Sequence, residues 1–240
     1  MKDIKHLRKS IVVAAAIIGV IFGLVIPSIS LFVRADSINP NVYSVDDKPY
    51  GITYAQWTAK WWQWSLSIPK EINPAGDTTG KNCMQNQNGP VWFLAGTFGG
   101  QAERSCTLPA GKAILFAPIN AECSYAEYTN LKSESELRTC AKTIQDKTTQ
   151  IDVTIDGVKI QNLDKYRIQS PLFSVTFPTN NVYGIASGTT QAVSDGNWVF
   201  LHPLSPGKHE IRSKGASIDF TTTSTDNFLS DVTYHLIINP

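Results

Sequence analysis

The residues whose types could do chemistry in this 240-residue chain are mainly carboxylates in predicted loops and turns. Glu122 and Glu127 flank Cys123, while Asp77 and Asp195 lie close to glycines. Two carboxyl groups about 5–10 Å apart can hydrolyse a glycosidic bond, because one protonates the leaving oxygen and the other acts as base or nucleophile. Glu122 and Asp195 are the catalytic candidates of this kind. The alternative is structural, since an aspartate in a glycine turn commonly caps that turn with its own side chain.

Tryptophans form a second group, dense enough to provide a stacking platform for a sugar ring: Trp57, Trp61, Trp62, Trp64 and Trp92. Three of them recur with Ile68 at the spacing of one α-helix face that ends at Pro69, and this spacing predicts that they are core residues. Trp62 lies about 100° around the helix from Trp61. Trp62 is therefore the candidate for an exposed, ligand-binding aromatic side chain.

Residue spacing gives no support to other kinds of site. The chain has no Gly-x-Ser-x-Gly turn, no phosphate-binding glycine loop and no CxxC pair. His202, His209 and His235 lie in predicted strands or at a strand end, where we expect hydrogen-bonding residues in place of metal ligands. The sequence predicts neither a metal site nor a cofactor.

All four cysteines lie well after the N-terminal segment, and their even number is typical of disulfides formed in an oxidising compartment. Four cysteines allow three pairings. We favour Cys83–Cys106 with Cys123–Cys140, because each bond closes a short local loop and stabilises the fold by about 3 kcal/mol through the entropy of the unfolded chain.

Residues 1–35 form a segment of a different kind. Basic residues between positions 2 and 9 precede an uncharged apolar run over residues 11–33, which Arg34 closes. This pattern predicts a signal peptide or an N-terminal membrane anchor. Pro27 breaks the run and favours cleavage after Ala35, whereas the length of the run is sufficient to span about 30 Å of bilayer. Both interpretations place the rest of the chain outside the cytoplasm.

The charge of the remaining chain limits its partners. Residues 1–35 contain five basic residues and one acidic residue, so removing them changes the net charge from +1 to −3. No cluster of lysine and arginine follows Arg34, which argues against a nucleic-acid partner. The partners we expect are the membrane, through the N-terminal segment if it is not cleaved, and a cell-surface or carbohydrate ligand.

The order of the predicted elements indicates fold class. Residues 36–50 are polar and predict a linker, and residues 51–240 predict a single extracytoplasmic domain. Helices are predicted after Thr53 and from the capping box at Ser133 to about Gln150. Strands are predicted over residues 89–100, 112–119, 151–155, 158–160, 172–177, 196–201, 209–212, 217–221 and 231–238. Many short strands and two helical segments predict a mainly β, α+β domain, a β-sandwich or jelly roll, preceded by an N-terminal hydrophobic helix.

Four sequence blocks carry a resemblance. They are WWQW at 61–64, GPVWFLAGTF at 89–98, NAEC at 120–123, and DGNW at 195–198 with LSPG at 204–207. On these blocks, which span nearly the whole predicted domain, the chain resembles a family of uncharacterised exported microbial proteins. The resemblance implies an extracytoplasmic location and a single domain, and it implies no activity or ligand.

The sequence as a whole favours a secreted or cell-surface binding or structural module over an enzyme. The alternative is a secreted carbohydrate-active hydrolase that uses paired loop carboxylates. A cleft that holds two facing carboxylates would favour the hydrolase, whereas a filled sandwich without a groove would favour the module.

Overall fold

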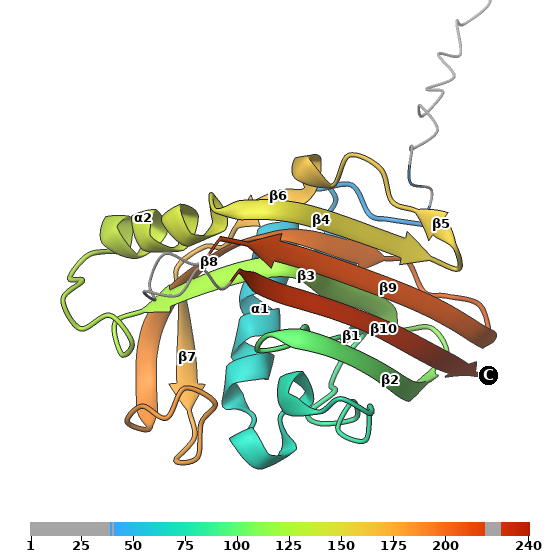
Figure 1. Cartoon of the computed structure of the whole chain (residues 1–240), viewed down its shortest axis with the longest axis horizontal. Coiled ribbons are helices and arrows are strands. Elements are labelled where there is room, and N and C mark those ends of the chain that lie inside the picture. Colours follow the sequence, from blue (N-terminus) through green and yellow to red (C-terminus); the bar gives the residue numbers. More distant parts are fainter. Residues whose placement is uncertain (1–38, 40, 219–226) are drawn as a thin grey trace, which may run out of the picture. The chain divides into compact units, whose positions relative to one another are not determined.

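The computed structural model describes residues 39, 41–218 and 227–240, which belong to one compact unit (Figure 1). The predicted N-terminal helix and part of the predicted strand at 217–221 lie outside these residues. Within the described part, no helix combines the length and apolarity that a membrane span requires.

The described residues form a mainly β fold of two mixed five-stranded sheets packed together, with two α-helices, as the sequence predicted. The first sheet has the order β1-β3-β8-β6, with β7 also pairing with β8; these strands are β1 (Val91–Phe93), β3 (Ala113–Ser124), β6 (Arg167–Gln169), β7 (Phe173–Phe177) and β8 (Gly188–Leu201). The second has the order β2-β10-β9-β4-β5; these strands are β2 (Gly100–Pro109), β4 (Thr148–Ile155), β5 (Val158–Lys159), β9 (Gly207–Ser217) and β10 (Phe228–Asn239).

A dry core fills the space between the two sheets. Its buried side chains include Leu108, Ile114, Phe116, Val153, Val199, Ile211, Val232 and Leu236. The two sheets are in close contact where β3 shifts its register between Phe116 and Ile119. Gly215 of β9 allows this approach, because a Cβ atom there would lie 2.2 Å from the carbonyl oxygen of Pro118.

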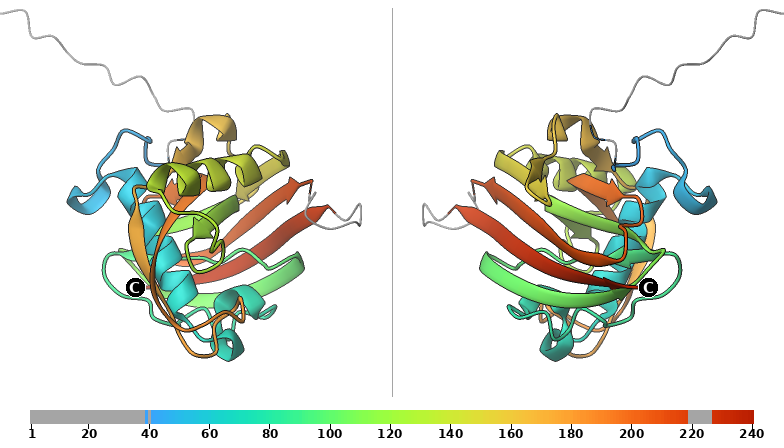
Figure 2. Two further views of the ribbon diagram at one scale, coloured as in Figure 1. Left: turned by 90° about the vertical axis from the view of Figure 1, so that its left-hand side faces the viewer. Right: turned by 90° about the vertical axis from the view of Figure 1, so that its right-hand side faces the viewer.

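Helix α1 (Tyr54–Ser67) covers the other face of the first sheet, so that this sheet lies between α1 and the second sheet (Figure 2). The helix begins at a capping box in which Thr53 and Gln56 bond each other's backbone N–H groups. Trp57, Trp61 and Trp64 are buried, and each indole N–H donates to a backbone carbonyl. The predicted core stripe of this helix is confirmed.

Helix α2 (Glu134–Gln145) packs on β3 and β8, and the predicted capping box at its start is present. It ends at Gln145, earlier than predicted, because the chain enters β4 at Thr148. The disulfide Cys123–Cys140 joins this helix to β3, and Cys83–Cys106 joins the loop after α1 to β2. Both predicted pairings are confirmed.

Other local predictions also differ from the structure. Within the described residues the predicted strand at 209–212 and the start of the predicted strand at 217–221 fall in the single strand β9, and β8 begins at Gly188, before the predicted start at 196. The predicted strand over residues 89–100 is only β1, and β2 was missed because Arg104 occupies a buried position and breaks the apolar alternation. The predicted linker packs on the domain near its start: Val42 is buried and pairs with Leu201.

Replacing Trp61 with alanine should lower the free energy of unfolding by about 3–5 kcal/mol, because it removes a buried aromatic ring and leaves a cavity. Lys60→Ala, at an exposed position of the same helix, is the matched control and should cost less than about 1 kcal/mol. Urea denaturation measures both. Equal effects would contradict the core position of Trp61.

Candidate functional site

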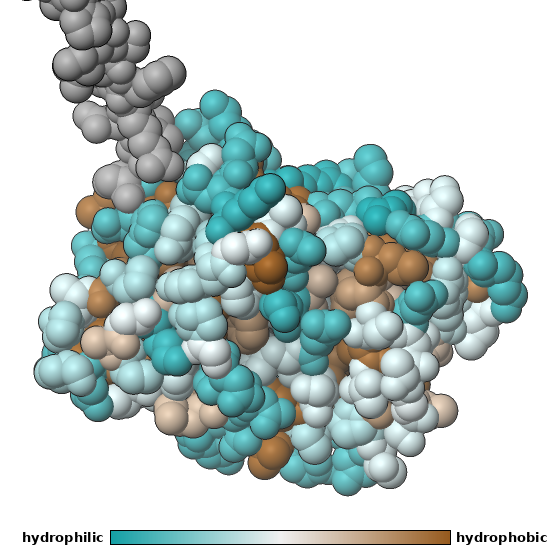
Figure 3. Space-filling model, turned by 180° about the vertical axis from the view of Figure 1, so that it is seen from behind, coloured by the Kyte–Doolittle hydropathy of each residue, from teal (hydrophilic) through white to brown (hydrophobic). Residues whose placement is uncertain are grey.

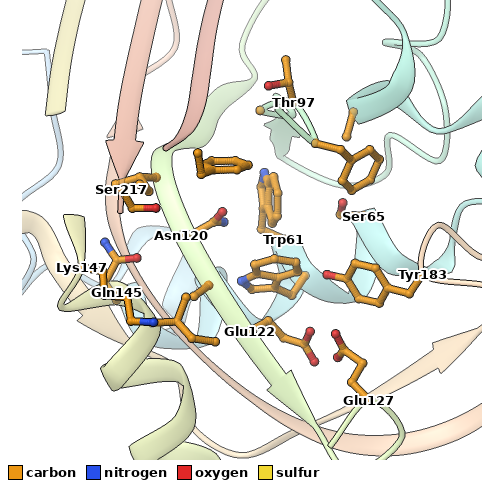
Figure 4. A pocket seen from close by; sticks show the side chains of 18 of the residues that line it. Trp61, Ser65, Thr97, Asn120, Glu122, Glu127, Gln145, Lys147, Tyr183 and Ser217 are labelled. Carbon is orange, nitrogen blue, oxygen red and sulfur yellow. The ribbon is translucent and has the colours of Figure 1, made fainter. Parts of the chain in front are cut away.

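A pocket of about 370 Å³ lies between α1 and the part of β3 that follows the register shift (Figure 4). Its walls come from several segments that are distant in sequence. Its lining residues include Trp61, Trp62 and Ser65 of α1, Asn120 and Glu122 of β3, Gly96, Thr97 and Phe98 after β1, Glu127 and Tyr128 after β3, Gln145 and Lys147 near the end of α2, and Tyr183.

The pocket exists because β1 is short. It pairs only with Ala113–Leu115 of β3, so in the described part of the chain no strand covers this edge of β3 further on. Side chains alternate between the two faces of a strand. Asn120 and Glu122 therefore share the face toward α1, whereas Cys123 lies on the opposite face and bonds α2.

The most unusual groups in the pocket are two facing carboxyls, those of Glu122 and Glu127 (Figure 4). Glu122 is only 6% exposed, and neither of its carboxyl oxygens has a hydrogen-bond partner among the described residues. Glu127 accepts a hydrogen bond of 2.6 Å from the hydroxyl of Ser124. Two carboxylates cannot bond each other, but a carboxylic acid can donate to a carboxylate, so one proton suits this pair.

The electrostatics favour the same proton. Burial raises the pKa of Glu122 well above its usual value, and the negative charge of Glu127 raises it further. Burial also raises the pKa of Glu127, although its bonds with Ser124 oppose this rise. The pair therefore keeps a proton to a higher pH than an exposed glutamate does.

Three further groups surround this pair. The pKa of Tyr183 is raised well above its usual value, first by burial and then by the charges of Glu122 and Glu127, so its hydroxyl stays protonated. The side-chain nitrogens of Trp62 and Asn120 are buried and have no hydrogen-bond partner among the described residues. The pocket thus combines unpaired donors, unpaired acceptors and aromatic walls.

The structure does not bring the predicted catalytic candidates together. Asp195 lies in β8, not in a turn, and pairs with Ala121 of β3. Because neighbouring residues of a strand face opposite ways, Asp195 and Glu122 lie on opposite faces of the sheet. The Asp195 carboxylate accepts two hydrogen bonds of 3.0 Å from Arg167, which gives it a structural role.

Trp62 lies in the pocket, but only 8% of its surface is accessible. The prediction that this side chain is exposed is therefore wrong. Its ring packs edge-on against Trp61 with centroids 5.1 Å apart. The missed residues are Glu127 as the partner of Glu122, Asn120 and Tyr183. Asn120 lies two residues before Glu122, so strand alternation could have placed both on one face, whereas no spacing relates Glu127 or Tyr183 to Glu122.

Three other titratable residues that could have belonged to a site, Asp77, His209 and His235, have structural partners. The Asp77 carboxylate accepts bonds from the backbone of Thr79 and Asn82, as a turn-capping aspartate does. His209 bonds Asp156, and His235 bonds Glu103. Within the described residues no group of three or more histidine, cysteine, aspartate or glutamate side chains could hold a metal ion.

The buried side chain of Arg104, in β2, holds one wall of the pocket in place. It is 1% exposed and donates five hydrogen bonds. The acceptors are the carbonyls of Ala75, Asp77, Ala95 and Gly96 and the hydroxyl of Tyr234. These bonds tie the loop after α1 and the segment after β1 to the second sheet, and Gly96 begins the part of that segment that lines the pocket.

Comparisons with protein-family models, with curated proteins and with solved structures found no match to this chain.

Arg104→Met should lower the free energy of unfolding by at least about 3 kcal/mol, because each buried acceptor left without a donor costs about 1–3 kcal/mol. Arg212→Met, which removes a largely exposed arginine, is the control and should cost less than about 1 kcal/mol. Urea denaturation at neutral pH compares them, and a small effect of Arg104→Met would show that these carbonyls do not depend on the guanidinium.

The raised pKa of Glu122 predicts how stability depends on pH. Between the ordinary and the raised pKa, the folded protein keeps the Glu122 proton whereas the unfolded chain has lost it. The contribution of Glu122 to the free energy of unfolding is therefore greatest below the ordinary pKa near 4.5 and declines as pH rises toward the raised value. Glu122→Gln should flatten this decline and be more stable than the parent at pH 8, since an amide can donate to Glu127. Denaturation from pH 5 to 8 measures it, with exposed Glu71→Gln as control; equal slopes for all three proteins would refute the prediction.

Proposed function

We propose that this protein is an extracytoplasmic ligand-binding module, secreted or held at the cell surface, whose ligand lies in the pocket between α1 and β3. One observation carries the proposal: two residues that line the pocket, Asn120 and Trp62, have buried side-chain nitrogens that lack hydrogen-bond partners among the described residues. Native proteins leave few such atoms, because each costs about 1–3 kcal/mol. Their gathering at one pocket is expected where a ligand completes the hydrogen bonds.

The distribution of exposed apolar residues supports the same site. Phe98, Tyr128 and Ile218 are large apolar side chains with 53%, 36% and 38% of their surface exposed, and all three line the pocket. The face opposite to that of Figure 1 is mainly hydrophilic, with hydrophobic residues in small separate groups (Figure 3). Exposed apolar side chains that gather at a pocket favour ligand binding there.

Two features support the extracytoplasmic location. Both disulfides are of the kind that persists in an oxidising compartment. The basic residues before position 10 and the apolar run at 11–33 are the pattern that export machinery recognises. In this proposal residues 1–35 direct export, either as a cleaved signal peptide or as a membrane anchor.

The geometry favours binding over hydrolysis. A catalytic carboxyl has to come within hydrogen-bond distance of the reacting group. The Glu122 oxygens are closed off from solvent, and Glu122 and Glu127 face each other instead of flanking a space for a sugar (Figure 4). Two carboxyls that face each other in this way are arranged to share a proton.

A secreted carbohydrate-active hydrolase is the second candidate function, and one observation favours it. The pocket holds two facing carboxyls, and the raised pKa of Glu122 is the property that a general acid needs. In such an enzyme Glu127, and not Asp195, would be the partner of Glu122.

Native mass spectrometry of the protein purified from its own cells tests the binding function. We expect a mass increment from a bound small molecule. Asn120→Leu should lower its occupancy at least tenfold and raise the free energy of unfolding by about 1 kcal/mol, because it removes an unpartnered amide of similar size. Asn88→Leu, at an exposed position outside the pocket, is the control and should keep the ligand.

Other results would contradict the binding function. The binding function is contradicted if no mass increment is found and no sugar, amine or carboxylic acid changes the melting temperature in a way that Asn120→Leu abolishes. Release of nitrophenol from a nitrophenyl glycoside, lost in Glu127→Gln, would establish the hydrolase in its place.

A further inference from the structure

We infer that the ligand of this pocket is a small organic cation with an N–H group, its ammonium bound against the Glu122–Glu127 pair and its carbon skeleton along the Trp62 indole. This inference rests on the proposed binding function and names the class of ligand. It is carried by the facing carboxyls, by the aromatic walls, and by the fact that no basic side chain of the described residues is among the groups that shift the pKa of these carboxyls.

The charge of the site is the first argument. The groups that shift the pKa of Glu122 and Glu127 are burial, the two carboxyls themselves and Ser124, and no basic side chain is among them. Tyr183 and Tyr128 also line the pocket; Tyr183 is neutral because its pKa is raised. Lys147 lies on the side of the pocket away from Glu127 (Figure 4). A cationic ligand therefore supplies the positive charge that the Glu122–Glu127 pair lacks.

The walls are the second argument. Trp62, Tyr128, Tyr183 and Phe98 surround the pocket with aromatic rings, which attract ammonium groups through their faces and bury the carbon atoms next to them. The pocket volume of about 370 Å³ is within the range of small-molecule sites. A calcium ion takes six to eight oxygen ligands, and two carboxyls between aromatic rings do not provide them. An organic cation fits both the charge and the walls.

Access decides how the ammonium binds. The Glu122 oxygens are closed off, whereas Glu127 is partly exposed. The ammonium donates to Glu127, and its charge acts on Glu122 through a medium of low polarity, where it is weakly screened. The carboxyl pair then ionises fully and its proton passes to the solvent. The balance is one cation bound and one proton released, with no bond in the ligand broken.

Isothermal titration calorimetry with two probes of equal shape tests this inference: 2-phenylethylamine, a cation at pH 7, and the neutral 2-phenylethanol. We expect the amine to bind the purified protein at least tenfold more tightly than the alcohol. Titrations in phosphate and in HEPES buffer, which differ in ionisation enthalpy and contain no primary ammonium group, should show the release of close to one proton for each amine bound.

Variants separate the two carboxyls. Glu122→Gln should abolish the proton release, because the shared proton is no longer present, while the single Glu127 carboxylate still binds the amine. Glu127→Gln should weaken amine binding at least tenfold, because it removes the direct partner. Glu71→Gln, an exposed glutamate outside the pocket, should change neither quantity. The melting temperature of each variant verifies that it is folded.

The outcomes that overturn the inference leave the proposed function separately testable. Equal binding of alcohol and amine, both lost in Asn120→Leu, would retain the binding site and refute a cationic ligand. Amine binding without proton release in the parent protein would refute the role of the carboxyl pair. If native mass spectrometry finds a neutral or anionic molecule in the pocket and neither probe binds, the inference fails while the binding function stands.

Discussion

The buried guanidinium of Arg104 is the interaction on which the arrangement of the layers depends. A charge so deeply buried is costly unless every donor is satisfied. Here the acceptors come from the loop after α1, the segment after β1 and Tyr234 of β10. Satisfying one side chain therefore holds three sequence-distant segments together, and the segment after β1 that begins one wall of the pocket is among them.

Several buried groups of the pocket lower the stability of the fold. Glu122 is buried beside another carboxyl, and Asn120 and Trp62 keep side-chain nitrogens without partners among the described residues. The rigid surroundings make this possible. The Cys123–Cys140 disulfide holds α2 on the opposite face of β3. On the same face as Asn120, Gly196 of β8 leaves space for the Asn120 side chain, since a Cβ atom at position 196 would lie 2.6 Å from the Cβ of Asn120. Groups that lower stability and are held in place by rigid surroundings are typical of functional sites.

A binding function and a proton-sharing carboxyl pair support each other physically. Without a ligand, the Glu122 and Glu127 carboxylates would repel each other in these nonpolar surroundings if both were ionised. One shared proton lowers the charge of the Glu122 and Glu127 pair from −2 to −1 and so reduces this repulsion, and in the proposed function a bound cation would take the place of that proton. The affinity of such a site rises with pH, because at higher pH less work is needed to remove the proton.

The sequence by itself determined the features that depend on neighbours along the chain: the tryptophan stripe and Thr53 cap of α1, the start of α2, the hairpin turn at Asp156, and the two disulfides that close short loops. Tertiary structure alone decided the site. The register of β3 against β8 turned Asp195 away from Glu122, and the short β1 left open the edge beside which Trp62 is buried. Periodicity and capping are local and are visible in the sequence, whereas strand register and the partners of a buried charge join residues that no sequence spacing relates.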